Sequence, residues 1–113
     1  MLIFLAAAAW ICLASEIPTA LAERIVDAIY VAEGGARAKV PYGILSVPVK
    51  DATEARRVCL NTVRNNWRRW GAAGRPGEYL TFLARRYCPP SVDPVGHRNW
   101  LTNVRRQLAK KER

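Results

Sequence analysis

The sequence predicts a small, mainly α-helical domain with an irregular loop or a short β segment after its first helix. The chain has 113 residues, and 50% of them are hydrophobic, so one domain with a folded core is feasible. Apolar residues recur at three- and four-residue spacings in several stretches, which is the period of a helix. Glycine and proline break this pattern between residues 34 and 50, where they exclude a regular helix.

The first 22 residues differ in composition from the rest and predict a secretory signal peptide that is cut after Ala22. The stretch from Leu2 to Ser15 is nearly all apolar, and small residues stand at both recognition positions before the cut. Because no lysine or arginine precedes Arg24, an uncleaved N-terminal membrane anchor is the alternative. We expect residues 23–113 to form an exported domain, periplasmic or extracellular, which stays membrane-tethered if the leader is retained.

The first helix of this domain is predicted to end at Glu33. Its apolar face has helical spacing and comprises Ile25, Val26, Ile29 and Tyr30. Gly34 and Gly35 then stop the helix, because glycine enters positive φ without steric penalty. A carboxyl at the negative pole of a helix, if aromatic neighbours also shield it, favours its protonated form and is a candidate general acid. The alternative is an ordinary surface glutamate before a glycine cap.

The second helix begins at the capping box Asp51–Glu54 and ends at Gly71. Its apolar face is formed by Ala55, Val58, Cys59, Thr62, Val63, Trp67 and Trp70. Five arginines lie mostly off that face and form either a basic track for an anionic ligand or a solvated surface. They are Arg56, Arg57, Arg64, Arg68 and Arg69.

Two shorter helices follow. One runs from about Glu78 to Tyr87, before the stop at Pro89 and Pro90, and its tyrosines either reach a cleft or belong to the core. The last runs from near His97 to about Lys110. It is expected to bury Trp100, Val104 and Leu108.

Two cysteines, Cys59 and Cys88, remain after removal of the leader. Because an exported chain enters an oxidising compartment, they predict a disulfide that stabilises a small core by roughly 3 to 4 kcal/mol. Two buried free thiols are the alternative.

All 18 basic residues but only eight of the nine acidic ones follow the predicted cut, so the mature chain carries a net charge of +10. The charge of such a basic protein favours an anionic polymer as its partner. An exported chain meets anionic envelope polymers, so nucleic acid is not expected as a partner. The lone His97 and two distant cysteines make no convincing zinc site, and no phosphate loop or serine nucleophile motif is present. No metal or cofactor is expected.

The order of these features resembles the lysozyme-like superfamily, in particular lytic transglycosylases and phage-type muramidases. In these families a Glu-Gly-Gly or Glu-Ser-Gly step supplies the catalytic acid, here Glu33 followed by two glycines. A later Tyr-Gly-Ile or similar segment packs beneath the glutamate and lines the sugar cleft, here Tyr42, Gly43 and Ile44. The resemblance covers residues 23–47 and implies a lysozyme-like enzyme of the bacterial cell wall, which we expect to be a monomer. With Tyr87 as a further cleft residue, it would cleave peptidoglycan glycan strands.

The chain departs from this family pattern in the short segment before Tyr42 and in lacking Gln or Asn after Ile44. No second acid lies nearby, since Asp51 and Asp93 have structural reasons for their positions. The resemblance therefore implies a single-glutamate cleavage of the β-1,4 bond after N-acetylmuramic acid, ending in either an anhydro or a reducing product. The rival hypothesis is a non-enzymatic basic module that binds an anionic envelope polymer or a partner protein through its arginines.

Overall fold

The computed structural model describes residues 16–44 and 49–111 of the chain, and this part is mainly helical. Its elements in chain order are α2 (Thr19–Ala32), the 3₁₀ turns η1 (Gly35–Arg37) and η2 (Pro41–Gly43), α3 (Ala52–Ala72), α4 (Tyr79–Tyr87) and α5 (Pro94–Lys111). No strand occurs among the described residues. The predicted helical fold is confirmed, and the segment after the first helix is irregular where it is described.

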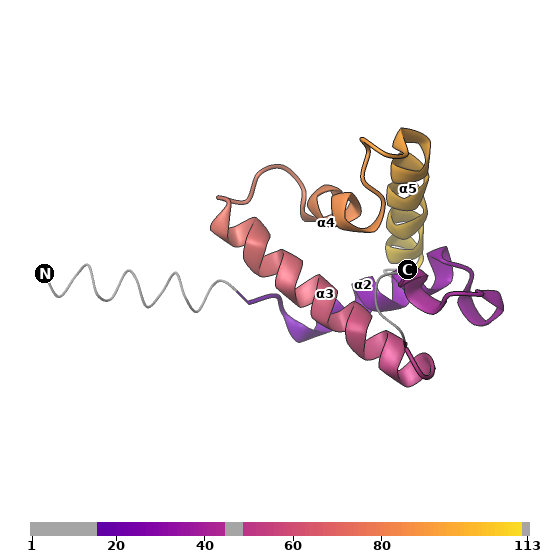
Figure 1. Ribbon diagram of the computed structural model, residues 1–113. Coiled ribbons are helices and arrows are strands. Elements are labelled where there is room, and N and C mark those ends of the chain that lie inside the picture. Colours follow the sequence, from indigo (N-terminus) through magenta and orange to yellow (C-terminus); the bar gives the residue numbers. More distant parts are fainter. Residues whose placement is uncertain (1–15, 45–48, 112–113) are drawn as a thin grey trace, which may run out of the picture.

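Helix α2 lies at the centre of the helical domain and packs against both α5 and α3 (Figure 1). Helix α4 contacts α3 on one side and α5 on the other, and η2 packs against α2 and α3. The core at these contacts is built from apolar faces with helical spacing, which contribute Ile25, Ile29, Cys59, Val63, Leu83 and Val104, among others. Full burial of one such aliphatic side chain stabilises a fold by roughly 1.5–3 kcal/mol.

The start of α3 follows the predicted capping box. The Asp51 side chain accepts a hydrogen bond of 2.8 Å from the backbone N–H of Glu54. The Glu54 carboxyl reaches back and accepts one of 2.8 Å from the N–H of Lys50. These bonds satisfy donors that a helix start otherwise leaves unpaired, so α3 begins at a defined residue and places its apolar face accurately.

Helix α5 begins at Pro94, three residues before the predicted start near His97. Proline fits the first helical position, where no N–H is needed. The carboxyl of Asp93 accepts a hydrogen bond of 2.8 Å from the N–H of Gly96 and so caps the first turn. The helix therefore starts earlier than its apolar spacing predicts, because the Asp93 cap and Pro94 add a first turn before His97.

The folded unit extends to residues before the predicted cut at Ala22. Ile17 and Ala22 belong to the buried core, and the latter lies in the first turns of α2. Glu16 pairs with Arg68 of α3 at 2.8 Å. A cut after Ala22 would therefore remove the start of α2 together with these contacts. The apolar stretch that predicts a leader, residues 1–15, lies outside the described residues. Within the described ranges, no helix is both long enough and apolar enough to cross a membrane.

Candidate functional site

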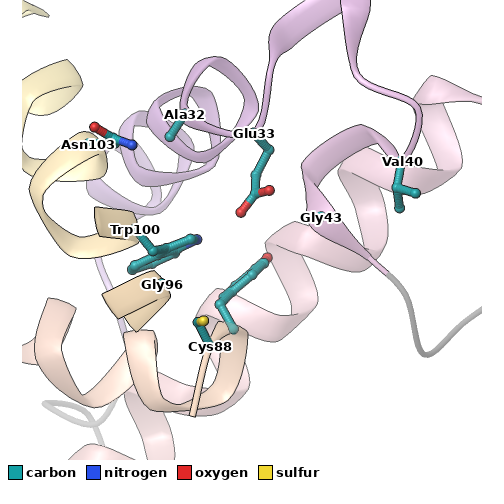
Figure 2. A pocket seen from close by; sticks show the side chains of 9 residues that line it. Ala32, Glu33, Val40, Gly43, Cys88, Gly96, Trp100 and Asn103 are labelled. Carbon is teal, nitrogen blue, oxygen red and sulfur yellow. The ribbon is translucent and has the colours of Figure 1, made fainter. Parts of the chain in front are cut away.

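A pocket of about 450 Å³ opens where the end of α2 meets η2, the end of α4 and the first half of α5. Figure 2 shows the Glu33 side chain directed into the space between Trp100 and the segment that carries Gly43. The residues that line this pocket are Ala32, Glu33, Val40, Gly43, Tyr87, Cys88, Gly96, Trp100 and Asn103. Glu33 is the sole acidic side chain among them.

Local backbone structure fixes the position of Glu33. It is the C-cap residue of α2, and its N–H donates a hydrogen bond of 2.9 Å to the carbonyl of Ile29. Gly34 follows with φ of 108° and donates to the carbonyl of Val31 at 3.1 Å. This conformation ends the helix at once, as the paired glycines predict, so the glutamate projects from a rigid helix end.

The Glu33 carboxyl rests directly on the backbone of Gly43. A Cβ atom built on this glycine would lie 2.8 Å from the carboxyl carbon and 2.9 and 3.0 Å from the two oxygens, and real Cβ atoms essentially never come closer than 3.0 Å to such atoms. Gly43 has φ of 67°, and the preceding Tyr42 also has positive φ, at 60°. Only glycine at residue 43 allows the carboxyl to lie here, because any side chain would occupy the same space.

Trp100 forms the opposite wall of the pocket. Its ring stacks on Tyr87 with centroids 5.1 Å apart and planes 20° from parallel. The nitrogen end of the indole points toward the Glu33 carboxyl (Figure 2). The indole Nε1 is buried and makes no hydrogen bond of normal geometry with any group that the structure describes.

Burial of its carboxyl raises the pKa of Glu33 above the ordinary value, and the nearby indole N–H of Trp100 opposes part of that effect. The carboxyl also lies at the negative end of α2, which disfavours its charged form. No arginine or lysine of the described ranges lies within ion-pair distance of it. The group is therefore suited to hold a proton at a higher pH than an exposed glutamate does.

The predicted disulfide between Cys59 and Cys88 is wrong for this structure, in which both are free thiols. Cys59 is fully buried in α3, and its Sγ lies 3.1 Å from the Tyr87 hydroxyl. Tyr87 thus occupies the position facing α3 that Cys88 would need. The Cys88 side chain instead lines the pocket, with its Sγ 3.9 Å from the carbonyl oxygen of Asp93.

The four residues predicted to bind substrate are divided by the structure. Gly43 and Tyr87 line the pocket with Glu33, whereas Tyr42 and Ile44 are not part of its wall. Tyr42 is only 5% exposed. Its ring packs on Tyr30 with centroids 5.1 Å apart. The Tyr-Gly-Ile segment therefore supports the glutamate from below, and its glycine is the part that reaches the pocket.

The Tyr42 hydroxyl faces the guanidinium of Arg56. Tyr42 is the main cause, and Asp27 the second, of a raised Arg56 pKa. Arg56 also donates to the Asp27 carboxyl at 2.7 Å. The phenol therefore links η2 to α3 and α2 beneath the pocket, and this linkage helps to hold Gly43 against the carboxyl.

The basic face of α3 is largely engaged within the chain. Arg56 pairs with Asp27, Arg68 pairs with Glu16, and Arg57 lies 3.6 Å from Glu54. Such pairs leave fewer guanidinium groups for an anionic ligand. They therefore weaken the hypothesis that the arginines of α3 form a basic track for such a ligand.

No group of three or more His, Cys, Asp or Glu side chains that could hold a metal ion occurs within the described ranges. His97 accepts or donates a hydrogen bond of 2.9 Å through Nδ1 at the carbonyl of Cys88, so it links α5 to the end of α4. The two other acids considered from the sequence, Asp51 and Asp93, both cap helices. Neither lines the pocket.

Several lining residues were not predicted to line a cleft, and those with polar or sulfur-bearing side chains are Cys88, Trp100 and Asn103. Trp100 was expected to be buried, and it is, but its indole nitrogen also faces the pocket. One signal was available in the sequence, because a buried tryptophan carries an N–H that needs a partner. Asn103 lies one turn after Trp100 and carried no such signal.

No protein-family model matches this chain, and searches of curated proteins and of solved structures found no match.

Proposed function

We propose that the protein cleaves peptidoglycan with Glu33 as its general acid. It acts on the β-1,4 bond between N-acetylmuramic acid and N-acetylglucosamine. One observation carries the proposal: a half-buried glutamate with a raised pKa projects from a rigid helix end into an open pocket, fixed between Gly43 and Trp100. The volume of about 450 Å³ lies within the range of small-molecule sites, roughly 300–1,000 Å³.

Glycosidic bonds break when an acid protonates the leaving oxygen while positive charge develops on the sugar. A carboxyl whose pKa is raised by burial keeps the required proton near neutral pH. Glu33 meets this requirement, and its fixed position allows the proton to be delivered along one direction. The resemblance of the Glu-Gly-Gly and Tyr-Gly-Ile segments to the lysozyme-like superfamily supplies the substrate class.

The absence of a second carboxyl among the lining residues favours a single-glutamate mechanism over a two-carboxylate one. The acetamido carbonyl of the substrate would stabilise the developing cation. Glu33, now ionised, would then act as base. If it takes the proton of the C6 hydroxyl, the product is a 1,6-anhydromuramoyl end, as in lytic transglycosylases. If it takes a proton from water, the product is a reducing end, as in lysozymes.

The net charge of +9 supports a cell-wall substrate, because basic proteins concentrate near anionic envelope polymers. Export to the periplasm or the extracellular space, by a cleaved leader or with a retained anchor, belongs to this proposal. The wall would then be the compartment in which the enzyme meets its glycan strands.

The test is mass spectrometry of the muropeptides released when the purified protein is incubated with sacculi. Glu33→Gln keeps the shape of the side chain but removes its acid function. Glu23→Gln is the matched control, since Glu23 is exposed on the same helix and lies outside the pocket. We expect release by the wild type and by Glu23→Gln, and a loss of at least about 100-fold in Glu33→Gln.

Anhydro ends would assign transglycosylase chemistry and reducing ends muramidase chemistry. Equal release by the wild type and Glu33→Gln, or none by a folded wild-type protein, would reject the enzyme. The basic binding module would then be the hypothesis to pursue.

A further inference from the structure

The indole N–H of Trp100 is a buried donor without a partner among the described residues. Trp100 is 7% exposed, so water does not cover its ring. Buried indole N–H groups normally find an acceptor, because an unsatisfied buried donor costs free energy. The Glu33 carboxyl is the acceptor that this donor faces, and the indole N–H already opposes part of the effect of burial on the Glu33 pKa.

The position of this donor is fixed by packing. Trp100 stacks on Tyr87, and α5 packs along α2, the helix that ends at Glu33. Figure 2 shows the nitrogen end of the indole pointing toward the carboxyl across the pocket. A protonated carboxyl is a weaker acceptor than a carboxylate, whose hydrogen bonds are shorter and stronger.

Other polar groups around Glu33 are already engaged or stay neutral. From α3, Cys59 faces it, and burial raises the pKa of that thiol to about 11. From α4, Tyr87 and Cys88 face it, and burial raises the pKa of each. The Tyr87 hydroxyl is bonded to Cys59.

The guanidinium of Arg56 on α3 is engaged with Asp27 and with the hydroxyl of Tyr42 on η2. From α5, the lining side chains are the neutral Asn103 and Trp100. Among these groups, the indole N–H alone combines burial, orientation toward the carboxyl and a free hydrogen.

We propose that Trp100 is a positioning residue that donates its indole N–H to the Glu33 carboxylate after the acid has lost its proton. A neutral donor has an advantage over a cation here. It stabilises the carboxylate in place but does not hold it permanently ionised, as a buried arginine would. The hydrogen bond itself requires no particular substrate. Its value for returning Glu33 from base to acid during glycan cleavage rests on the proposed function.

The experiment is a carboxyl ¹³C NMR titration of Glu33 in the full chain. Trp100→Phe keeps an aromatic ring next to Tyr87 but removes the N–H together with the five-membered half of the indole. Trp70→Phe is the matched control, because the Trp70 indole donates to the Pro76 carbonyl at 3.3 Å and lies outside the pocket. We expect Glu33 to titrate at higher pH in Trp100→Phe than in the wild type, and at an unchanged pH in Trp70→Phe. An unchanged or lower titration midpoint in Trp100→Phe would overturn the proposal.

A second measurement needs no change at Trp100. The indole proton resonance of Trp100 in the wild type should move downfield as Glu33 ionises, and it should be independent of that pH range in Glu33→Gln. If the chemical shift of this indole proton in the wild type does not change as Glu33 ionises, the hydrogen bond is refuted, even if Trp100→Phe fails to fold.

Glycan release adds a third readout. In Trp100→Phe we expect roughly tenfold slower release, the factor for losing one hydrogen bond to a charged group, with the high-pH limb moved upward. Positive titrations together with no release from sacculi would reject the proposed function and retain the role of Trp100. If glycan is released but the Glu33 and indole titrations are unchanged, the proposed function is retained and the role of Trp100 is rejected.

Discussion

Replacing Gly43 by alanine tests whether the backbone beneath Glu33 sets the position of its carboxyl. The new Cβ would lie 2.8 Å from the carboxyl carbon, which has to recede to at least 3.4 Å for ordinary contact. The substitution also places a side chain at φ of 67°. Its effect therefore has two parts, backbone strain and displacement of the acid.

Gly77→Ala separates these parts. Gly77 has φ of 66°, nearly the same as Gly43, but a Cβ built there meets nothing within 4 Å. Both variants pay about 1–2 kcal/mol for a side chain in the left-handed region, less about 0.4–1 kcal/mol gained from a stiffer unfolded chain. Only Gly43→Ala adds the collision with Glu33. We expect it to lose about 1 kcal/mol more stability than the control, the low end of the usual cost of overpacking, because the atoms that the Cβ meets lie at the end of a flexible side chain that can move aside.

The assays are urea unfolding, ¹³C titration of the Glu33 carboxyl and muropeptide release. Displacement of a reacting group by about 1 Å costs on the order of 100-fold in rate. Gly43→Ala should therefore release glycan about 100-fold more slowly, whereas Gly77→Ala should match the wild type. The Glu33 titration should change only in Gly43→Ala. Equal stability and an equal Glu33 titration in the two variants would refute the claim that Gly43 holds the acid.

Two further predictions concern Glu33 and the cysteines. Because burial raises the folded-state pKa of Glu33, its contribution to stability is complete below the unfolded value of about 4.3 and is lost as pH rises through the folded value. Thermal unfolding should therefore show Glu33→Gln more stable than the wild type at pH 7 and no more stable near pH 4; a constant difference would contradict this sign. Iodoacetamide at pH 8 should label the half-buried Cys88 long before Cys59, whose pKa is raised to about 11, as read by peptide mapping. Earlier labelling of Cys59 would show that it is not buried beneath Tyr87.

Features set by neighbouring residues were predictable from the sequence. The end of α2 at Glu33 follows from two glycines at positive φ. The start of α3 follows from the side chain of Asp51, which bonds a backbone group three residues away. Each signal acts within one helical turn, so no knowledge of the tertiary packing was needed.

Features set by contacts between helices were not predictable in the same way. The periodicity of α5 predicts that Trp100 is buried but not that its nitrogen faces the end of α2. The predicted disulfide between Cys59 and Cys88 is absent because the side chain at the end of α4 that faces Cys59 is that of Tyr87, one residue before Cys88. The sequence does not show which of these two neighbours faces α3. Local sequence signals therefore predict the position of Glu33, whereas the position of Trp100 in the pocket depends on tertiary packing.

The electrostatic setting of Glu33 differs from that of the paired acids. In a chain with 18 basic and nine acidic residues, arginines pair with Glu16, Asp27, Glu54 and Glu78. Glu33 is half-buried and has no ion pair in the described part of the chain. Burial of an unpaired carboxyl lowers stability near neutral pH, and a glutamine of the same shape would avoid that cost. Packing alone therefore gives no reason for an acid at this position. A need for a transferable proton does give one, because the same burial that weakens the fold keeps the proton on the carboxyl.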